Sequence, residues 1–364
     1  MTIQNITNYI EELAPLNYAE DFDNVGLLIG NYQTEVTGVL VTLDTLEETV
    51  DEAIAKNCNL IVSFHPIIFG GLKKINGNNY VERVVLKAIQ NNIAIYATHT
   101  ALDNSKNGVS AKMCEVLGLI NTKILIPKKG IIKKLTTYVP VDKASTLKEK
   151  LFEAGAGSLG NYDLCSFDVR GNSSFRGNEN SNPTYGKKGE LTEREETKIS
   201  VVFESKNESA ILKALKGNHE YEEVAYEIVT TENVYQNIGM GMIGEFETEM
   251  DEKDFLAYLK KTMKTDCVRH SALINKKIKK VAVLGGSGSF AISNAKKAGA
   301  DAYISADFKY HEFFKAENSI LLADIGHYES EQFTKNLLVD YLTKKFSNFA
   351  VILSEKSTNP IYYI

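Results

Sequence analysis

Three histidines stand at positions where their ring nitrogens could bind a metal ion. Each follows an apolar run that predicts a β-strand: His65, His99 and His327. Open α/β sheets bind ligands beyond the carboxyl ends of their strands, and neighbouring parallel strands lie about 5 Å apart. If the strands before His65 and His99 are neighbours, their imidazoles meet at one edge of the sheet. Because neutral imidazole is a common metal ligand, the pattern favours a metal site.

Two carboxylates accompany these histidines. Asp103 closes the segment His99-Thr-Ala-Leu-Asp103, and Glu331 follows His327 by four residues, so on a helix the last two share one face and can grip one ion. Imidazole and carboxylate together suit Zn, Mn, Fe, Co or Ni, and a carboxylate-rich set is typical of two adjacent ions. Each motif taken alone is also compatible with a packed histidine or a solvated ion pair.

Two further segments follow predicted strands in the last third of the chain. Gly285–Phe290 is rich in glycine and precedes a predicted helix, so its backbone N–H groups could cradle an anion or form a tight turn. The segment Ser305–His311 contains side chains that suit proton transfer or phosphate contact, namely Asp307, Lys309, Tyr310 and His311. Ordinary loop polarity is the alternative explanation for the second segment.

The charge of the chain argues against nucleic acid as a partner. Lys plus Arg total 41 and Asp plus Glu total 47, which gives a formal net charge of −6. Lys260–Lys280 is locally basic, with Asp266 as its one acid, and either nucleic-acid contact or a solvated connection explains it. A small anionic molecule remains compatible with the candidate site.

Strand and helix signals alternate in the first and last thirds of the chain, as in a doubly covered α/β sheet. The middle third reads strand, helix, a Gly/Asn/Ser-rich loop over Gly171–Gly189, then strand, helix and strand, which suits a ferredoxin-like unit. We therefore predict an α/β fold with a split core domain, residues 1–130 and 236–364, and an inserted ferredoxin-like α+β domain, residues 131–235. Such insertions occur at exposed loop tips.

The core is predicted to contain seven strands and several helices. Its predicted strands are Gly38–Leu43, Asn59–Ser63, Ile93–Ala97, Lys280–Leu284, Ala302–Ser305, Ile320–Ile325 and Ala350–Ser354. The predicted helix that matters most for the candidate site is Glu331–Lys344, because it begins with a candidate metal ligand.

Composition indicates a globular protein of more than one domain, with 364 residues, 43% hydrophobic and 24% charged. No apolar run approaches the roughly 20 residues that cross a bilayer, and Met1–Pro15 lacks a signal-peptide pattern, so we expect a cytoplasmic protein without a membrane partner. The cysteines are widely spaced, which argues against disulfides and thiolate zinc sites and favours buried, reduced thiols: Cys58, Cys114, Cys165 and Cys267.

These motifs resemble those of the Nif-three-like dinuclear metal centre family, often labelled GTP cyclohydrolase I type 2 homologs, in its long form. The resemblance covers nearly the whole chain and rests on ordered segments: Phe22–Gly30, His65–Phe69, His99–Asp103, Gly239–Gly244, Gly285–Ser289, Asp307–His311 and Gly326–Glu331. The middle of the chain is similar to the family's PII/CutA-like insert, through Gly155–Tyr162, Cys165–Phe167, Gly186–Gly189 and His219–Tyr226.

The resemblance implies up to two divalent metal ions per chain in a ring-like homohexamer. By position, His65 and Asp103 would bind one ion, His327 the other, and Glu331 would bridge both. The family usually has a second histidine where this chain has Phe64, which cannot bind a metal. We therefore expect unequal occupancy of the two positions, or a substitute ligand such as water or His99.

Two functions fit these observations. In the first, the chain is a metal-dependent hydrolase in which His99 or His311 moves protons and Lys309 helps to hold a nucleotide-like or phosphorylated small molecule. In the second, it is a metal-binding regulatory or scaffold homohexamer, whose PII-like insert senses a ligand and which has no turnover. The substitution at Phe64 favours the second.

Overall fold

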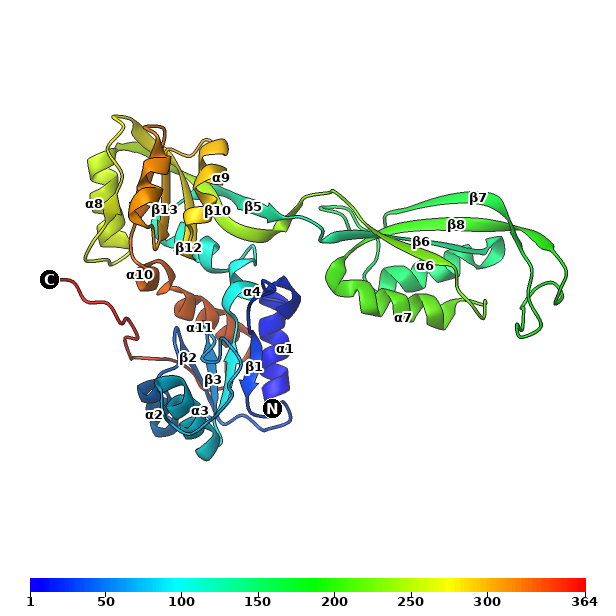
Figure 1. The fold of residues 1–364 in the computed structure, drawn as a ribbon, viewed down its shortest axis with the longest axis horizontal. Coiled ribbons are helices and arrows are strands. Elements are labelled where there is room, and N and C mark those ends of the chain that lie inside the picture. Colours follow the sequence, from blue (N-terminus) through cyan, green and yellow to red (C-terminus); the bar gives the residue numbers. More distant parts are fainter. The chain divides into compact units, whose positions relative to one another are not determined.

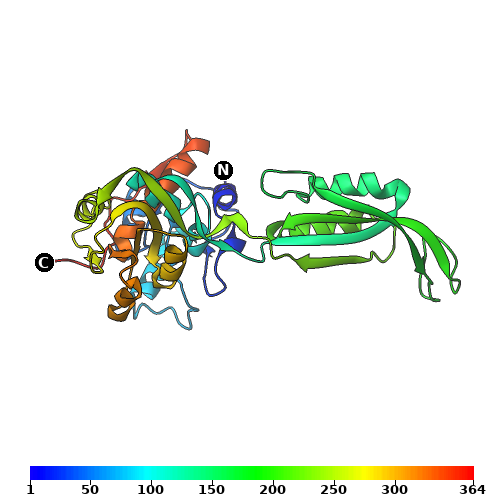
Figure 2. The same ribbon diagram turned by 90° about the horizontal axis from the view of Figure 1, so that it is seen from above.

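A computed structural model describes residues 1–364. The chain divides into two compact units, which Figures 1 and 2 show in the colours of the sequence. The core unit comprises Met1–Pro127 and Asn237–Ile364, and the inserted unit comprises Lys128–Gln236. No helix is both long and apolar enough to span a membrane.

The first sheet of the core unit has five strands in the order β1-β4-β3-β2-β15. Its central strands β2, β3 and β4 are fully buried and run parallel, as their continuous apolar sequences predict. Strand β15 pairs in parallel with β2, and β1 pairs antiparallel with β4. The strand bounds are Gly26–Ile29 (β1), Val39–Thr42 (β2), Leu60–Ser63 (β3), Ala94–Ala97 (β4) and Val351–Leu353 (β15).

Helices cover both faces of this sheet. Alternate residues of one strand point to opposite faces: Val39 and Val41 pack with helices α1 and α11, whereas Leu40 packs with α2 and α3. The buried face of α1 carries isoleucines at helical spacing, including Ile6 and Ile10. These helices are Ile3–Leu13 (α1), Glu47–Ala55 (α2), Tyr80–Gln90 (α3) and Thr334–Lys345 (α11).

A second sheet of six strands, in the order β11-β14-β13-β12-β10-β5, completes the core unit. Strands β12, β13 and β14 are parallel, whereas β10 pairs antiparallel with β12 and β11 antiparallel with β14. The core therefore has two sheets rather than the single doubly covered sheet that we predicted, and the strand before His327 belongs to a different sheet from the strands before His65 and His99. The strands are Ile120–Lys128 (β5), Tyr235–Asp251 (β10), Arg269–His270 (β11), Lys277–Ser287 (β12), Ala302–Ala306 (β13) and Leu321–Asp324 (β14).

Helices also pack on both faces of the second sheet. The buried residues of α5 and α8 form one apolar cluster with its strands, and those of α9 form another. The two helices that carry candidate ligands, α4 and α10, are short. The bounds are His99–Asp103 (α4), Val109–Leu117 (α5), Glu252–Thr262 (α8), Ile292–Lys297 (α9) and His327–Glu331 (α10). The 3-10 helices are Leu16–Tyr18, Val141–Lys143, Ser205–Asn207, Ser289–Ala291 and Tyr310–Ala316.

The inserted unit has the element order βαββαβ around a four-stranded antiparallel sheet, β7-β8-β6-β9, which is the arrangement of ferredoxin-like units. Helices α6 and α7 pack together on one face of the sheet (Figure 1). The elements are Ile132–Pro140 (β6), Ala144–Glu153 (α6), Ser166–Phe175 (β7), Thr192–Glu204 (β8), Glu208–Asn218 (α7) and Tyr226–Thr230 (β9).

Several local expectations differ from the structure. The first residues of the predicted loop Gly171–Gly189 belong to β7, because β8 pairs with that strand along its whole length despite its poor strand propensity. The predicted helix Glu331–Lys344 is interrupted: Glu331 ends α10, and α11 begins at Thr334. Two of the four cysteines are partly exposed rather than buried, namely Cys165 and Cys267.

Candidate metal centre

Three side chains lie at the carboxyl edge of the first sheet. Asp44 follows β2, His65 follows β3 and His99 follows β4, and these strands are direct neighbours. The predicted adjacency of the strands before His65 and His99 is therefore confirmed. Backbone hydrogen bonds hold the strand ends together: His65 N–H donates to Leu43 O at 2.9 Å, and His99 N–H donates to Phe64 O at 2.9 Å. The sheet thus positions all three side chains next to one another at its carboxyl edge.

The second sheet contributes its own carboxyl edge. Gly286 lies at the end of β12, Asp307 follows β13, and His327 follows β14 and begins α10. The backbone N–H of Ile325 donates to Ser305 O at 3.1 Å, which ties the segment before His327 to the neighbouring strand. The candidate site is therefore formed by the carboxyl ends of parallel strands from two different sheets of the core unit.

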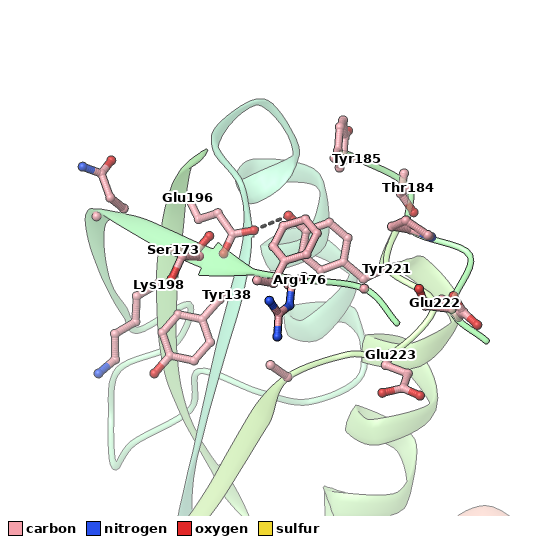
Figure 3. Close-up of a pocket in the computed structure, with 18 of the residues that line it drawn as sticks. Tyr138, Ser173, Arg176, Thr184, Tyr185, Glu196, Lys198, Tyr221, Glu222 and Glu223 are labelled. Atoms are coloured by element: carbon pink, nitrogen blue, oxygen red, sulfur yellow. Dashed lines mark hydrogen bonds between the residues drawn. The ribbon is translucent and has the colours of Figure 1, made fainter. Parts of the chain in front are cut away.

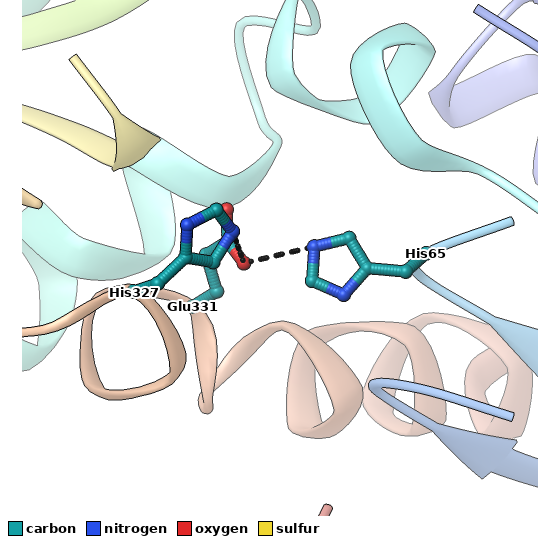
Figure 4. A group of neighbouring side chains, drawn as sticks. All are labelled: His65, His327 and Glu331. Atoms are coloured by element: carbon teal, nitrogen blue, oxygen red, sulfur yellow. Dashed lines mark ion pairs between the residues drawn. The ribbon is translucent and has the colours of Figure 1, made fainter. Parts of the chain in front are cut away.

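His65, His327 and Glu331 form a compact cluster between these two edges (Figure 4). One ligand atom from each lies within 4.8 Å of the others. The Glu331 Oε2 atom is 3.2 Å from the Nε2 atom of each histidine, yet it is buried and has no hydrogen-bond partner with aligned geometry. Two ring nitrogens and one carboxylate oxygen that face a common point are the donor set of a divalent metal ion.

Each histidine in this region is oriented by a carboxylate. The Nδ1 atom of His65 is 2.7 Å from Asp44 Oδ1, and the Nδ1 atom of His327 is 2.7 Å from Asp307 Oδ2. An Nδ1–H that donates to a carboxylate leaves the lone pair of Nε2 free to bind a metal. This pairing is typical of metal-binding histidines, and here it directs both Nε2 atoms toward Glu331.

Contacts with carboxylates raise the pKa values of His65 and His327 strongly. Burial alone would lower the pKa of His65, but the contacts with Asp44 and Glu331 outweigh it and raise that pKa to about 10. Burial is likewise outweighed at His327, where Asp307 and Glu331 raise the pKa to about 11. The carboxylates therefore favour positive charge at the position where the two imidazoles meet.

The two acids of the cluster shift in opposite directions. Burial opposes the charge of Glu331, but the two histidines outweigh it and lower the pKa of Glu331. Burial and repulsion from Glu331 raise the pKa of Asp103 well above its usual value. Because two adjacent carboxylates repel each other, the cluster favours a cation beside them, and a divalent ion would allow both to ionise. The residues therefore fit the expected metal.

Glycines make room for the cluster. Gly286 has φ +68°, and a Cβ there would collide with Glu331 and come within 3.4 Å of His327 Cε1. Its backbone N–H donates to Ser330 Oγ at 2.8 Å, so this N–H is already used and does not serve as an anion cradle. The glycine-rich segment thus allows close packing against Glu331.

His99 lies beside the cluster with its ring centroid 5.4 Å from that of His65. Its Nδ1 is 2.7 Å from Asp23 Oδ1, so it repeats the arrangement of the other two histidines. Its φ of +26° is unusual for a residue other than glycine, and such strain is frequent at functional sites. Phe64 is fully buried, with its ring centroid 4.8 Å from that of His65, and adds no ligand.

The other predicted site residues occupy different places. Asp103, at the end of α4, interacts electrostatically with Glu331 and both histidines but lies outside the group within 4.8 Å. Lys309 and His311 are exposed near the start of the 3-10 helix Tyr310–Ala316. The ring of His311 contacts those of Tyr310 and Phe314 rather than the cluster.

The sequence did not indicate which carboxylates orient the histidines. Asp44 was absent from the prediction, although it follows an apolar strand directly, as His65 does. Asp23 and Asp307 stand within motifs that we singled out but were not assigned as partners of His99 and His327. A search for one carboxylate per histidine among the residues that follow strands would have found Asp44 and Asp307.

Comparisons with known proteins agree with this architecture. The chain is 36% identical over 371 residues to the GTP cyclohydrolase 1 type 2 homolog of Bacillus subtilis (strain 168), with 99% of this chain and 98% of that protein covered. It is 33% identical over 368 residues to the protein of that name from Staphylococcus aureus (strain Mu50 / ATCC 700699), with both chains fully covered.

Solved structures show the same fold. A Bacillus cereus protein related to NIF3 is 34% identical, with a TM-score of 0.84 over 100% of this chain and 99% of that chain. Staphylococcus aureus protein SA1388 is 32% identical, with a TM-score of 0.80 over 100% of this chain and 99% of that chain. The model of the family described as Duf34/NIF3 (NGG1p interacting factor 3) matches residues 1–360. This chain therefore belongs to the Duf34/NIF3 family.

Proposed function

We propose that the chain is a metal-dependent hydrolase that acts on a nucleotide-like or phosphorylated small molecule. The observation that supports this most directly is the convergence of His65 Nε2, His327 Nε2 and Glu331 Oε2 within 4.8 Å. Asp103 lies in the same charged cluster, and with it the site could hold up to two ions. A divalent ion held here would supply a Lewis acid and lower the pKa of water.

Side chains beside the cluster could supply proton transfer and contacts with the substrate. His99, held at Nδ1 by Asp23, has its Nε2 available to take up a proton near the cluster. Phe22 and Phe69 are 66% and 54% exposed, and their ring centroids are 6.3 Å apart. The ring centroid of Phe69 is 6.0 Å from that of His99. Exposed rings beside the proposed base suit a substrate that contains an aromatic base. The name of the relatives, GTP cyclohydrolase 1 type 2 homolog, is compatible with this substrate class.

Hydrolysis by the native chain and by a Glu331→Gln variant tests the proposal. Protein supplied with Zn²⁺ or Mn²⁺ is incubated with nucleotides and sugar phosphates, and products are separated by chromatography. We expect turnover of at least one compound, and at least a hundredfold loss in Glu331→Gln because a metal ligand is removed. His270→Ala, which changes an exposed histidine on β11, should retain activity. Equal turnover in the native chain and Glu331→Gln would contradict the proposal.

A regulatory or scaffold role is the second candidate, and a specific observation favours it. Phe64 occupies the core where a second metal-binding histidine is expected, so one ion position lacks a ligand. In this proposal the chain is a ring-like homohexamer, and its insert, similar to PII and CutA domains, senses a ligand without turnover. The βαββαβ order of the insert supports that similarity. Bound metal without hydrolysis of any tested compound would favour this role over the first.

A further inference from the structure

The inserted unit contains a cavity of about 780 Å³ that the metal centre does not use. Leu135 and Ile199 of its sheet pack against helices α6 and α7, whereas Tyr138 and Lys198, at alternate positions of the same strands, line the cavity. The cavity therefore lies on the face of the sheet opposite the helices. Its other walls are β7, the start of the connection that extends beyond the sheet from β7 toward β8 (Figure 2), and the segment before β9.

Aromatic rings form one wall of the cavity (Figure 3). The ring centroid of Tyr221 is 6.5 Å from that of Phe175 and 6.1 Å from that of Tyr185. The Tyr221 hydroxyl donates a hydrogen bond to Glu196, and the Arg194 guanidinium carbon lies 3.6 Å from the centre of the Tyr185 ring. These contacts fix the rings, which remain partly exposed and can stack on a flat ligand.

Cationic side chains without an acidic partner line the same cavity. Arg176 and Lys198 form no ion pair in the structure, although both face a space that also contains carboxylates. Of these acids, Glu196 accepts the Tyr221 hydroxyl, and Glu222 accepts the backbone N–H of Asn182 at 2.6 Å. The third acid, Glu223, is exposed and lies across the space from Lys198 (Figure 3). Because no carboxylate lies within ion-pair distance of Arg176 or Lys198, both cations are free to pair with an anionic group of a ligand.

We propose that this cavity is a binding site for a small planar aromatic molecule that carries an anionic group. The ring stacks on Tyr221 and its aromatic neighbours, and the phosphate or carboxylate pairs with Arg176 and Lys198. The volume falls in the range of sites for small molecules, about 300–1,000 Å³. The site is formed wholly by residues of the inserted unit, so it is independent of the proposed hydrolase activity.

Isothermal titration of the full chain tests the proposal with three planar anions: AMP, flavin mononucleotide and indole-3-acetate. At least one should bind at micromolar to submillimolar concentration, and at least tenfold more tightly than its ring without the anion. For AMP, both adenosine and ribose 5-phosphate should bind more weakly. Tyr221→Ala and Arg176→Gln should each weaken binding roughly tenfold or more. Arg176 is exposed, so its variant should fold normally even if Tyr221→Ala does not.

Two controls locate the binding. Lys188→Gln changes an exposed cation on the same connection that does not line the cavity, and it should bind the probe like the native chain. Glu331→Gln disrupts the metal cluster, and the binding that Arg176→Gln weakens should persist in it. The proposal is overturned if no probe binds at millimolar concentration, if Arg176→Gln binds as tightly as the native chain, or if Glu331→Gln abolishes binding.

Discussion

Residue chemistry at the candidate site rests on three histidine–carboxylate pairs. His65, His99 and His327 each place Nδ1 at 2.7 Å from an aspartate oxygen. The aspartates fix the orientation of the rings, so the Nε2 atoms of His65 and His327 already point toward Glu331, and an ion that binds there would displace their protons. The geometry of the site therefore depends on residues outside the cluster of three ligand atoms.

Asp44→Asn should weaken metal binding without removing a ligand. The amide can still contact His65 but carries no charge, so His65 loses the partner that fixes its tautomer, and we expect affinity for Zn²⁺ to fall about 10- to 100-fold. Competition with a chromogenic chelator measures this affinity. Asp51→Asn, which alters an exposed partner of Lys87, is the control and should bind like the native chain. Unchanged affinity in Asp44→Asn would show that the pair is not needed.

Phe64→His should restore the ligand that this chain lacks. We expect one tightly bound ion per native chain, because three ligand atoms converge at one position, and two ions in the variant. Phe64→Leu keeps the buried site apolar and should remain at one ion. Elemental analysis after dialysis gives the count. Two tightly held ions in the native chain would instead mean that another side chain, such as His99, completes the second position.

At the scale of elements, the site residues lie just after the ends of strands. The sequence predicted this for His65, His99 and His327, but not which sheet each strand joins. Apolar runs identified β3 and β4, and their adjacency brought His65 and His99 together as expected. Local patterns could not show that His327 lies at the edge of a different sheet, since sheet membership depends on distant pairings. For the same reason the predicted last strand, Ala350–Ser354, gave no sign that β15 would join the first sheet beside β2.

Glu52 links helix α2 to the segment after β15. Its carboxylate accepts hydrogen bonds from Ser354 Oγ at 2.6 Å and Glu355 N–H at 3.0 Å, and it pairs with Lys56 at 3.1 Å. Burial alone would raise the pKa of Glu52, but these contacts outweigh it and lower the pKa below its usual value of 4.5. The contribution to stability is therefore complete above pH 4.5 and is lost as the pH falls through the lower pKa of the folded chain.

Glu52→Gln should reduce the free energy of unfolding at neutral pH by about 1–3 kcal/mol, because charged hydrogen bonds are lost. The deficit relative to the native chain should shrink as the pH falls below 4.5. Chemical unfolding at neutral pH and in increasingly acidic buffers measures both effects. Glu48→Gln, an exposed position on the same helix, should change little. A deficit that is equal at all pH values would show that the carboxylate charge is not its source.

At the scale of the whole molecule, two compact units divide the chain after Pro127 and again after Gln236. The change in composition and the order of elements indicated an insertion with boundaries near residues 130 and 235. The cavity of the insert was beyond prediction, because its walls join Tyr138, Phe175, Lys198 and Tyr221 from four separate segments. Only the folded sheet and the connections over it bring those side chains together.

The ring-like homohexamer proposed above predicts a defined mass in solution. Large apolar side chains are exposed on the core unit, including Phe290, Tyr310 and Phe314 at 55%, 74% and 65% exposure, and such residues favour association. Multi-angle light scattering after size-exclusion chromatography should give six times the mass of one chain. A mass that stays at one chain throughout the micromolar range would reject this assembly.

The most direct test of the account is the metal content of protein purified without chelators. Elemental analysis should find about one divalent ion per native chain and the same content in the His270→Ala control, which keeps the cluster intact. His327→Ala and Glu331→Gln should each lose most of the ion, since each removes one of the three converging ligand atoms. A native chain that binds no divalent ion, or variants that retain the native content, would contradict the assignment of this cluster as a metal centre.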